Sequence, residues 1–183
     1  MLNKVQRKKL LVIARNTIET YLISGKELTL TETDPALTRN AGVFVSLHEN
    51  NSLRGCIGSL CASGPLFLAV RDMAIQAALC DPRFPSLTIS ELPQVEIEIS
   101  VLSKMKRINS IEEIELGKHG VMVKKGSCCG VYLPQVALET GWSKEEFLSS
   151  LCAHKAGLPS EAWKDKFTEV CIFGAEVFSE KDN

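Results

Sequence analysis

The pattern of apolar and polar residues along the chain predicts both helices and strands. Residues 3–23 carry apolar side chains near helical spacing, and Gly25 follows as a plausible helix stop. Residues 95–101 instead alternate, with valine and isoleucine at odd positions and polar residues such as Glu96 and Glu98 at even ones. That alternation is typical of a strand with one buried face.

Hairpins are the commonest of the remaining predicted elements. A second helix is expected from Gly64-Pro65, with proline at its first position, to about Cys80, where Asp81-Pro82 stops it. The other expected elements are hairpins over residues 42–58 and 118–133, a helix from the Ser143 capping box to before Gly157, and a strand over residues 167–178. Because hairpins dominate, the sequence favours the α+β class, with a mostly antiparallel sheet and flanking helices, over a doubly wound fold.

Composition narrows the class of protein. The chain has 183 residues, of which 45% are hydrophobic, and a formal net charge of −1. This is ordinary globular composition, and we expect a single domain over residues 3–180, either undivided or built from two lobes. A near-zero net charge argues against nucleic acid as a partner, because such proteins normally present a basic face.

The cysteine count and the N-terminus bear on the compartment. Seven cysteines, an odd number, favour an intracellular chain with reduced thiols over a disulfide framework. The apolar run over residues 10–14 is too short for a signal peptide, and no segment has the ~20 apolar residues that cross a bilayer. We therefore expect a cytoplasmic protein without a membrane partner.

The stretch Ser52–Leu60, SLRGCIGSL, is the strongest candidate for chemistry. Cys56 lies between two glycines, and Arg54 precedes it by two residues. An arginine beside a thiol stabilises the thiolate, which is the nucleophilic form. Gly55 and Gly58 let a ligand or another backbone come close, or permit a bulge. The alternative is that Cys56 only fills space, as free cysteines often do.

The register of this hairpin decides where Cys56 points. Pairing His48 with Leu53 would divide the apolar side chains between two faces. Pairing Leu47 with Leu53 puts them on one buried face, so we expect this second register. Arg54 and Cys56 would then share the opposite, polar face.

Other candidates carry weaker signals. His119, at a strand start, is a candidate general base, although such a histidine is more often a structural residue. Glu98 is a candidate proton acceptor, or a member of an exposed face. The spacings of Cys56 with Cys61 and of Cys128 with Cys129 do not match paired zinc ligands, and no phosphate-binding loop is present, so we expect neither a metal nor a cofactor. The sequence GCIG matches the GXXG loop of KH domains, but its apolar pair and preceding strand argue against RNA binding.

Several motifs in fixed order give the chain a family resemblance. They are Gly42-Val-Phe-Val, Leu53-Arg-Gly-Cys-Ile-Gly58, Asp81-Pro-Arg-Phe84, the strand Glu96–Leu102, His119-Gly120, Leu133-Pro-Gln-Val-Ala137, Trp142, Phe147-Leu148, Cys152 and Lys155-Ala-Gly-Leu158. Over residues 5–178 the chain resembles the AMMECR domain family, named for a human chromosomal region linked to Alport syndrome with midface hypoplasia and elliptocytosis. The resemblance implies an α+β fold with a larger and a smaller lobe and a cleft between them. It also implies Memo-like and radical-SAM proteins as partners, but it supplies no reaction.

Two functional hypotheses follow. In the first, the chain is an enzyme or accessory enzyme that acts on a small molecule or a partner protein. Cys56 would supply the thiolate, Arg54 its electrostatic support, and His119 or Glu98 a proton acceptor. In the second, the same surface is a non-catalytic module that binds a ligand or a protein.

The resemblance also brings a second motif to the site. It places Asp81 and Arg83 with the LRGCIG strand, so we expect both beside Cys56 as ligand-binding residues together with Gly55 and Gly58. Among the other cysteines, we expect Cys80 and Cys171 to be buried.

Overall fold

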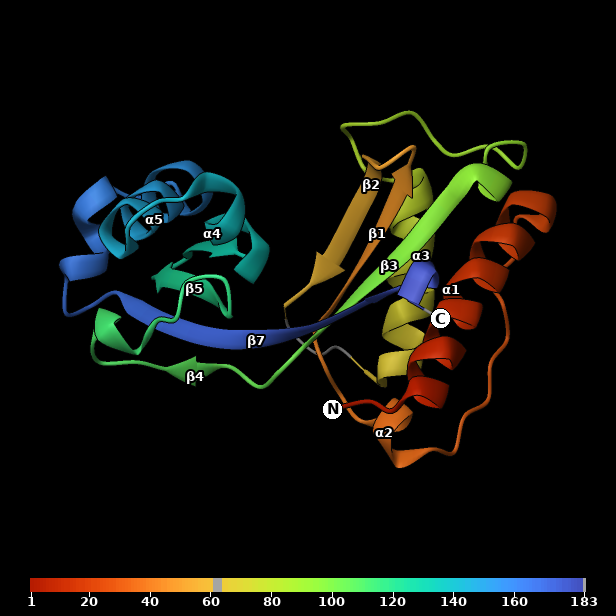
Figure 1. Ribbon diagram of the computed structural model, residues 1–183, viewed down its shortest axis with the longest axis horizontal. Helices are drawn as coiled ribbons and strands as arrows, with labels where there is room; N and C mark the ends of the chain where they lie inside the picture. The colour runs from red at the N-terminus through yellow and green to blue at the C-terminus, as the bar shows by residue number, and fades with distance from the viewer. Residues whose placement is uncertain (61–63, 183) are drawn as a thin grey trace. The chain divides into compact units, whose positions relative to one another are not determined.

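The computed structural model describes residues 1–60 and 64–182, and the chain divides into two compact units (Figure 1). Unit 1 comprises Met1–Leu102 and Glu176–Asn183, and unit 2 comprises Ser103–Ala175. Within each unit the strand pairings of the described residues are antiparallel, and helices accompany both sets of strands. The α+β class is therefore confirmed.

Unit 1 combines a three-stranded antiparallel arrangement with two long helices. Its elements are α1 (Lys4–Ser24), α2 (Pro35–Thr38), β1 (Val43–Glu49), β2 (Ser52–Ser59), α3 (Leu66–Leu79), the 3₁₀ turn η1 (Leu92–Gln94), β3 (Val95–Leu102) and the 3₁₀ turn η5 (Glu180–Asp182). Strand β1 is central, with β2 on one side and β3 on the other. The odd-numbered apolar residues of β1 and β3 are buried with apolar residues of α1 and α3 in one core.

The ends of α1 follow from its sequence. Asn3 and Gln6 form a reciprocal capping box at the start, and Gly25 ends the helix in the left-handed conformation with φ 68°. Helix α3 begins at Leu66, so Pro65 lies at the N-cap and not at the first helical position as expected. The short helix α2 was not predicted; Asp34 caps it by accepting a hydrogen bond from the Ala36 N–H.

The expected register of the first hairpin is wrong. Leu47 pairs with Gly55, while His48 pairs with Leu53, and a β-bulge at Arg54 separates the two pairings. The bulge inserts one extra residue, so the apolar residues before and after it are not forced onto one face. Leu53 is consequently 39% exposed and does not join the core.

Beyond the bulge, Cys56 lies on the expected face of the hairpin, opposite to the apolar residues. Val45 pairs with Ile57, and both pack in the core of unit 1. Ser46 pairs with Cys56, one position along. Because successive side chains of a strand alternate between faces, Ser46 and Cys56 lie on the face opposite to the helices.

Unit 2 is a second antiparallel arrangement with short helices. Its elements are β4 (Lys106–Arg107), the 3₁₀ turn η2 (Ile111–Glu113), β5 (His119–Lys125), β6 (Cys128–Tyr132), α4 (Pro134–Thr140), α5 (Lys144–Ser150), the π-helical turn η3 (Leu151–Ala156), the 3₁₀ turn η4 (Ser160–Lys164) and β7 (Glu169–Ser179), whose last residues belong to unit 1. The strand order in unit 2 is β4-β7-β5-β6. Val121, Phe147 and Leu151 are fully buried in its core.

Local signals predicted most of unit 2. The second hairpin and the final strand are confirmed, and Ser143 forms the expected capping box with Glu146. The helical path continues from α5 through η3 and ends at Gly157, which has a φ of 65°. Helix α4 was not predicted. Among the described residues, no helix is both long and apolar enough to cross a membrane.

Candidate functional site

A row of three polar side chains crosses the strands of unit 1 on the face opposite to the helices. Ser46 of β1 pairs with Cys56 of β2 on one side and with Glu98 of β3 on the other. Directly paired residues of antiparallel strands project to the same face, so the three side chains form one row. Ser46 is the middle member of the row.

Cys56 makes contacts through its side chain and both backbone groups. The Ser46 hydroxyl donates a hydrogen bond to the Cys56 Sγ over 3.2 Å. The Cys56 N–H donates to Asp81 Oδ2 at 2.8 Å, and the Cys56 carbonyl accepts from Arg83 Nη2 at 3.2 Å. Both backbone groups therefore point away from β1, which makes Ser46–Cys56 a non-hydrogen-bonded pair, the kind in which side chains approach most closely.

The turn after α3 supplies Asp81 and Arg83, and their expected position beside Cys56 is confirmed. Asp81 is 4% exposed, and its carboxylate accepts hydrogen bonds from the Cys56 N–H, from the Arg83 N–H and from Nε and Nη2 of Arg83. The Arg83 guanidinium holds the pKa of the Asp81 carboxyl well below its usual range. Burial alone would raise this pKa, and the hydrogen bond from the Cys56 N–H lowers it further. Asp81 is therefore a fixed anion that joins the turn to β2.

Arg83 is the arginine that lies against Cys56. The hydrogen bonds to Asp81 make the largest contribution to the raised pKa of Arg83, and the negative charge of a Cys56 thiolate raises this pKa further. Its side chain remains 55% exposed. A cation held beside a thiol in this way stabilises the thiolate.

Arg54 makes other contacts. It is 9% exposed, and its guanidinium donates to the Pro85 carbonyl at 2.9 Å and to Glu91 Oε1 at 3.0 Å. These bonds tie the bulge of β2 to the segment that precedes β3. By these contacts, Arg83 and not Arg54 is the arginine that binds the Cys56 backbone.

Glu98 and Glu96 of β3 have different environments although they are two residues apart. Burial raises the pKa of Glu98, with the nearby charge of His48 opposing this shift. A hydrogen bond from Lys181 lowers the pKa of Glu96, and the two groups form an ion pair at 2.5 Å. Glu98 is therefore the better candidate of the two for proton transfer, because it keeps its proton to a higher pH than Glu96 does.

His48 is a neighbour of Glu98 that was not among the candidate residues from the sequence. Its Nε2 lies 3.9 Å from Glu98 Oε1, and this nitrogen is buried without a hydrogen-bond partner. Ser46 was likewise not singled out. The signal for both residues is their shared even-numbered position on β1, which places them on the face of Cys56.

His119 belongs to unit 2 and is not part of the hydrogen-bonded cluster around Cys56. It begins β5, and its Nδ1 accepts a hydrogen bond from the Glu115 N–H at 3.1 Å. This contact fits the structural role that was the alternative for this residue. Among the residues of unit 1, Glu98 is the sequence-predicted proton acceptor that shares the row of Cys56.

The two glycines of the motif accommodate protein atoms. A Cβ atom at position 55 would lie 2.3 Å from the Ala77 carbonyl oxygen of α3, and one at position 58 would lie 2.2 Å from the Phe44 ring. Gly55 thus permits a close approach of β2 to α3, and Gly58 makes room for Phe44. These contacts explain both glycines by packing, without a bound ligand.

The remaining cysteines differ from expectation at one position. Cys171 is buried, as expected, and burial raises the pKa of its thiol. Cys80 is exposed, so the expectation that it is buried is wrong; it follows the last residue of α3 and faces solvent. Cys61 lies outside the described residues. Within residues 1–60 and 64–182, no three His, Cys, Asp or Glu side chains converge as metal ligands would.

Comparison with known proteins identifies the family. The AMMECR1 family model matches residues 11–178. A protein of Pyrococcus furiosus is 42% identical over 92% of this chain and 85% of its own length, and a protein of Methanosarcina mazei is 39% identical over 100% of this chain and 95% of its own. The crystal structure of the uncharacterized protein PH0010 from Pyrococcus horikoshii matches with a TM-score of 0.87 and 41% identity, covering 94% of this chain and 90% of that one. The chain therefore belongs to the AMMECR1 family.

Proposed function

We propose that unit 1 carries a thiol-dependent enzyme site in which Cys56 is the nucleophile. The observation that carries this proposal is the Ser46 hydroxyl donating to the Cys56 Sγ over 3.2 Å, beside a guanidinium that Asp81 holds in place. A hydrogen-bond donor and a nearby cation both favour the thiolate over the thiol. The thiolate is the form that attacks an electrophilic carbon and makes a sulfur–carbon bond.

Access to the thiol supports the same proposal. Cys56 is partly exposed, whereas Cys152 and Cys171 are buried and burial raises the pKa of both thiols. A reactive cysteine needs an electropositive, partly exposed environment, while buried structural cysteines are inert. Of these three cysteines, Cys56 alone has both.

Glu98 is proposed as the group that exchanges the proton of the reaction. Its raised pKa makes it able to hold a proton at a higher pH than an ordinary glutamate and to return it to a leaving group. Ser46 lies between Glu98 and Cys56 in the cross-strand row. A hydroxyl both donates and accepts hydrogen bonds, so it suits a position between the two groups.

A non-catalytic binding site is the second candidate, and one observation favours it. The Ser46 hydroxyl that donates to the Cys56 Sγ is not a base, and neither is the charged guanidinium of Arg83 beside it. In this case the exposed guanidinium of Arg83 would recognise an acidic group of a ligand or partner protein. The resemblance makes Memo-like and radical-SAM proteins the proposed partners in either case.

Thiol reactivity tests the enzymatic proposal. Native full-length protein is treated with limiting iodoacetamide across a range of pH, and each cysteine is quantified by peptide mass spectrometry. We expect Cys56 to be alkylated faster than the exposed Cys80 at neutral pH. The substitutions Ser46→Ala and Arg83→Met should each slow alkylation of Cys56 by about threefold to tenfold, because each removes one stabilising contact to the thiolate.

The control is Arg39→Met, which removes an exposed arginine of the same unit. This variant should label like the wild type, and the rate at Cys80 serves within each sample as a reference for intact folding. Alkylation of Cys56 no faster than that of Cys80 would eliminate the nucleophile proposal and leave the binding site.

A further inference from the structure

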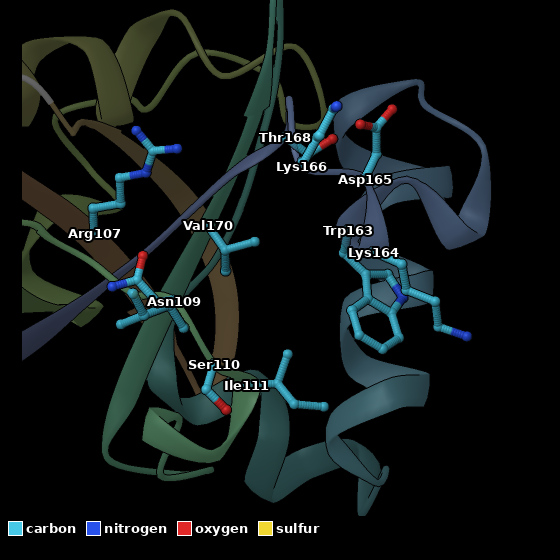
Figure 2. Close-up of a pocket in the computed structure, with 11 residues that line it drawn as sticks. Arg107, Asn109, Ser110, Ile111, Trp163, Lys164, Asp165, Lys166, Thr168 and Val170 are labelled. Carbon is cyan, nitrogen blue, oxygen red and sulfur yellow. The ribbon is translucent and has the colours of Figure 1, made fainter.

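Unit 2 contains a pocket that the cysteine site does not use (Figure 2). Its volume is about 240 Å³. Residues 107–111, from β4 to η2, and Val170 of β7 form one side, and residues 163–166, at the end of η4 and just after it, form the other. Pockets for drug-sized ligands usually measure ~300–1,000 Å³, so this one suits a smaller molecule, about the size of one ring with a substituent.

Apolar groups line part of the pocket. In Figure 2, the Trp163 indole lies across the pocket from Asn109, and Val170 and Ile111 project into the space between the two sides. The indole Nε1 donates to Ser149 Oγ at 3.1 Å, which fixes the orientation of the ring. A preformed wall of indole and aliphatic groups favours a ligand with a flat, apolar body.

The charges around the pocket leave one cation in excess. Three of its charged side chains form ion pairs: Asp165 with Lys125, Arg107 with Glu169, and Lys164 with Glu161. Lys166 is exposed at the pocket and, within the described residues, no ion pair is formed by it; its ammonium lies 5.0 Å from the centre of the Phe167 ring. The excess of a single positive charge matches a ligand with a single negative charge.

Arg107 adds to this preference. Its ion pair with Glu169 spans 3.6 Å, and the two side chains are 59% and 47% exposed. An exposed pair of this kind contributes little to stability, so the guanidinium can turn to a ligand at small cost. Arginine binds a carboxylate through two parallel hydrogen bonds.

We propose that this pocket binds a small aromatic or heteroaromatic carboxylate. The ring would lie against Trp163 and Ile111, and the carboxylate would be held by Lys166 and Arg107. The proposal rests on unit 2 alone and does not depend on the chemistry of Cys56.

Nicotinate, nicotinamide and acetate form a matched series of probes. Nicotinate has both the ring and the charge, nicotinamide keeps the ring without the charge, and acetate keeps the charge without the ring. Binding is followed by tryptophan fluorescence of a Trp142→Phe variant, in which Trp163 is the remaining tryptophan of the two. Ligand-observed saturation-transfer NMR on the wild-type chain gives a second readout that needs no substitution. We expect saturable binding of nicotinate, with the other two probes at least about tenfold weaker.

Two substitutions locate the binding. Arg107→Gln and Lys166→Gln each remove one of the charges that would hold the carboxylate; each should weaken nicotinate binding about threefold to tenfold. Lys124→Gln, at an exposed position of β5 that does not line the pocket, should leave it unchanged. Absence of saturable nicotinate binding in both readouts overturns the proposal. Equal binding of nicotinamide overturns the requirement for an anion, and nicotinate binding unaffected by both pocket substitutions overturns the location.

Discussion

Replacing Asp81 with asparagine should destabilise the protein in a way that depends on pH. The carboxylate is buried and accepts four hydrogen bonds, one from the Cys56 N–H and three from Arg83. Asparagine has nearly the same shape but no charge, and it keeps a single acceptor oxygen. The substitution therefore removes the anion that joins the turn after α3 to strand β2.

The magnitude follows from these contacts. A hydrogen bond to a charged group contributes ~1.5–3 kcal/mol, and this applies to the shielded Cys56 N–H. The Arg83 head is 55% exposed, so water replaces much of its interaction, and the pair counts as a surface salt bridge of about 0.5 kcal/mol. Since asparagine keeps one acceptor, we take the lower values and expect a loss of about 2 kcal/mol at pH 7.

The sign of the pH dependence is fixed by the lowered pKa of Asp81. A carboxyl whose pKa is lower in the folded state contributes stability above its unfolded pKa of ~3.9, and this contribution is lost as the pH falls through the folded pKa. Asparagine does not titrate. The stability difference between the wild type and Asp81→Asn should therefore be constant between about pH 6 and pH 8 and should shrink below about pH 4.

Urea unfolding measures both effects. The denaturation midpoint should fall at pH 7 while the m-value is unchanged. Asp72→Asn, at a carboxylate that is 44% exposed on α3, is the control and should stay within about 0.5 kcal/mol of the wild type. A loss that is as large at pH 3 as at pH 7 would show that the charge of Asp81 is not its cause, and no loss at all would refute the role assigned to these contacts.

Two other substitutions test the packing and the electrostatics of the same unit. Gly55→Ala should destabilise the protein by about 1–3 kcal/mol in urea unfolding, because its Cβ would lie 2.3 Å from the Ala77 carbonyl oxygen. The control Gly64→Ala has open space around its Cβ and should be neutral. A neutral Gly55→Ala would mean that α3 can move away from β2. Burial raises the pKa of Glu98, so its ionised form opposes folding, and stability decreases as the pH rises from its unfolded pKa of ~4.3 through the folded value. Glu98→Gln should therefore be as stable as or more stable than the wild type at pH 7, an advantage that disappears below about pH 4, and destabilisation at pH 7 would contradict this assignment.

Much of the fold could be predicted because its signals are local. The alternation over residues 95–101 gave both faces of β3, since a strand has a side-chain period of two. The capping box at Ser143 and the left-handed Gly157 marked the ends of the helical path formed by α5 and η3, because backbone groups at helix ends need nearby partners. Cys56 facing away from the core also followed from alternation.

The unpredicted features depend on contacts between residues far apart in the sequence. The bulge at Arg54 is tied by bonds to Glu91 and to the Pro85 carbonyl, and no pattern within the hairpin contains these partners. For the same reason the choice of Arg83 over Arg54 as the neighbour of Cys56 could not come from spacing along one strand. The approach of Asp81 was expected only through the family resemblance, since the turn after a helix gives no direction of its own.

The division of the chain has a consequence for synthesis on the ribosome. Unit 2, Ser103–Ala175, interrupts unit 1, so the segment from Glu176 onward emerges after all of unit 2 has been made. This segment completes unit 1: Phe178 is 2% exposed in its core, and Glu180 binds Arg15 of α1 and the Ile97 N–H of β3. Among the described residues of this buried core, Phe178 is the one that lies beyond Val101, so we expect unit 1 to pack most of its core before unit 2 has been made. The segment from Glu176 onward then closes a core that is already largely packed, and it is the last part of the chain to join unit 1 during translation.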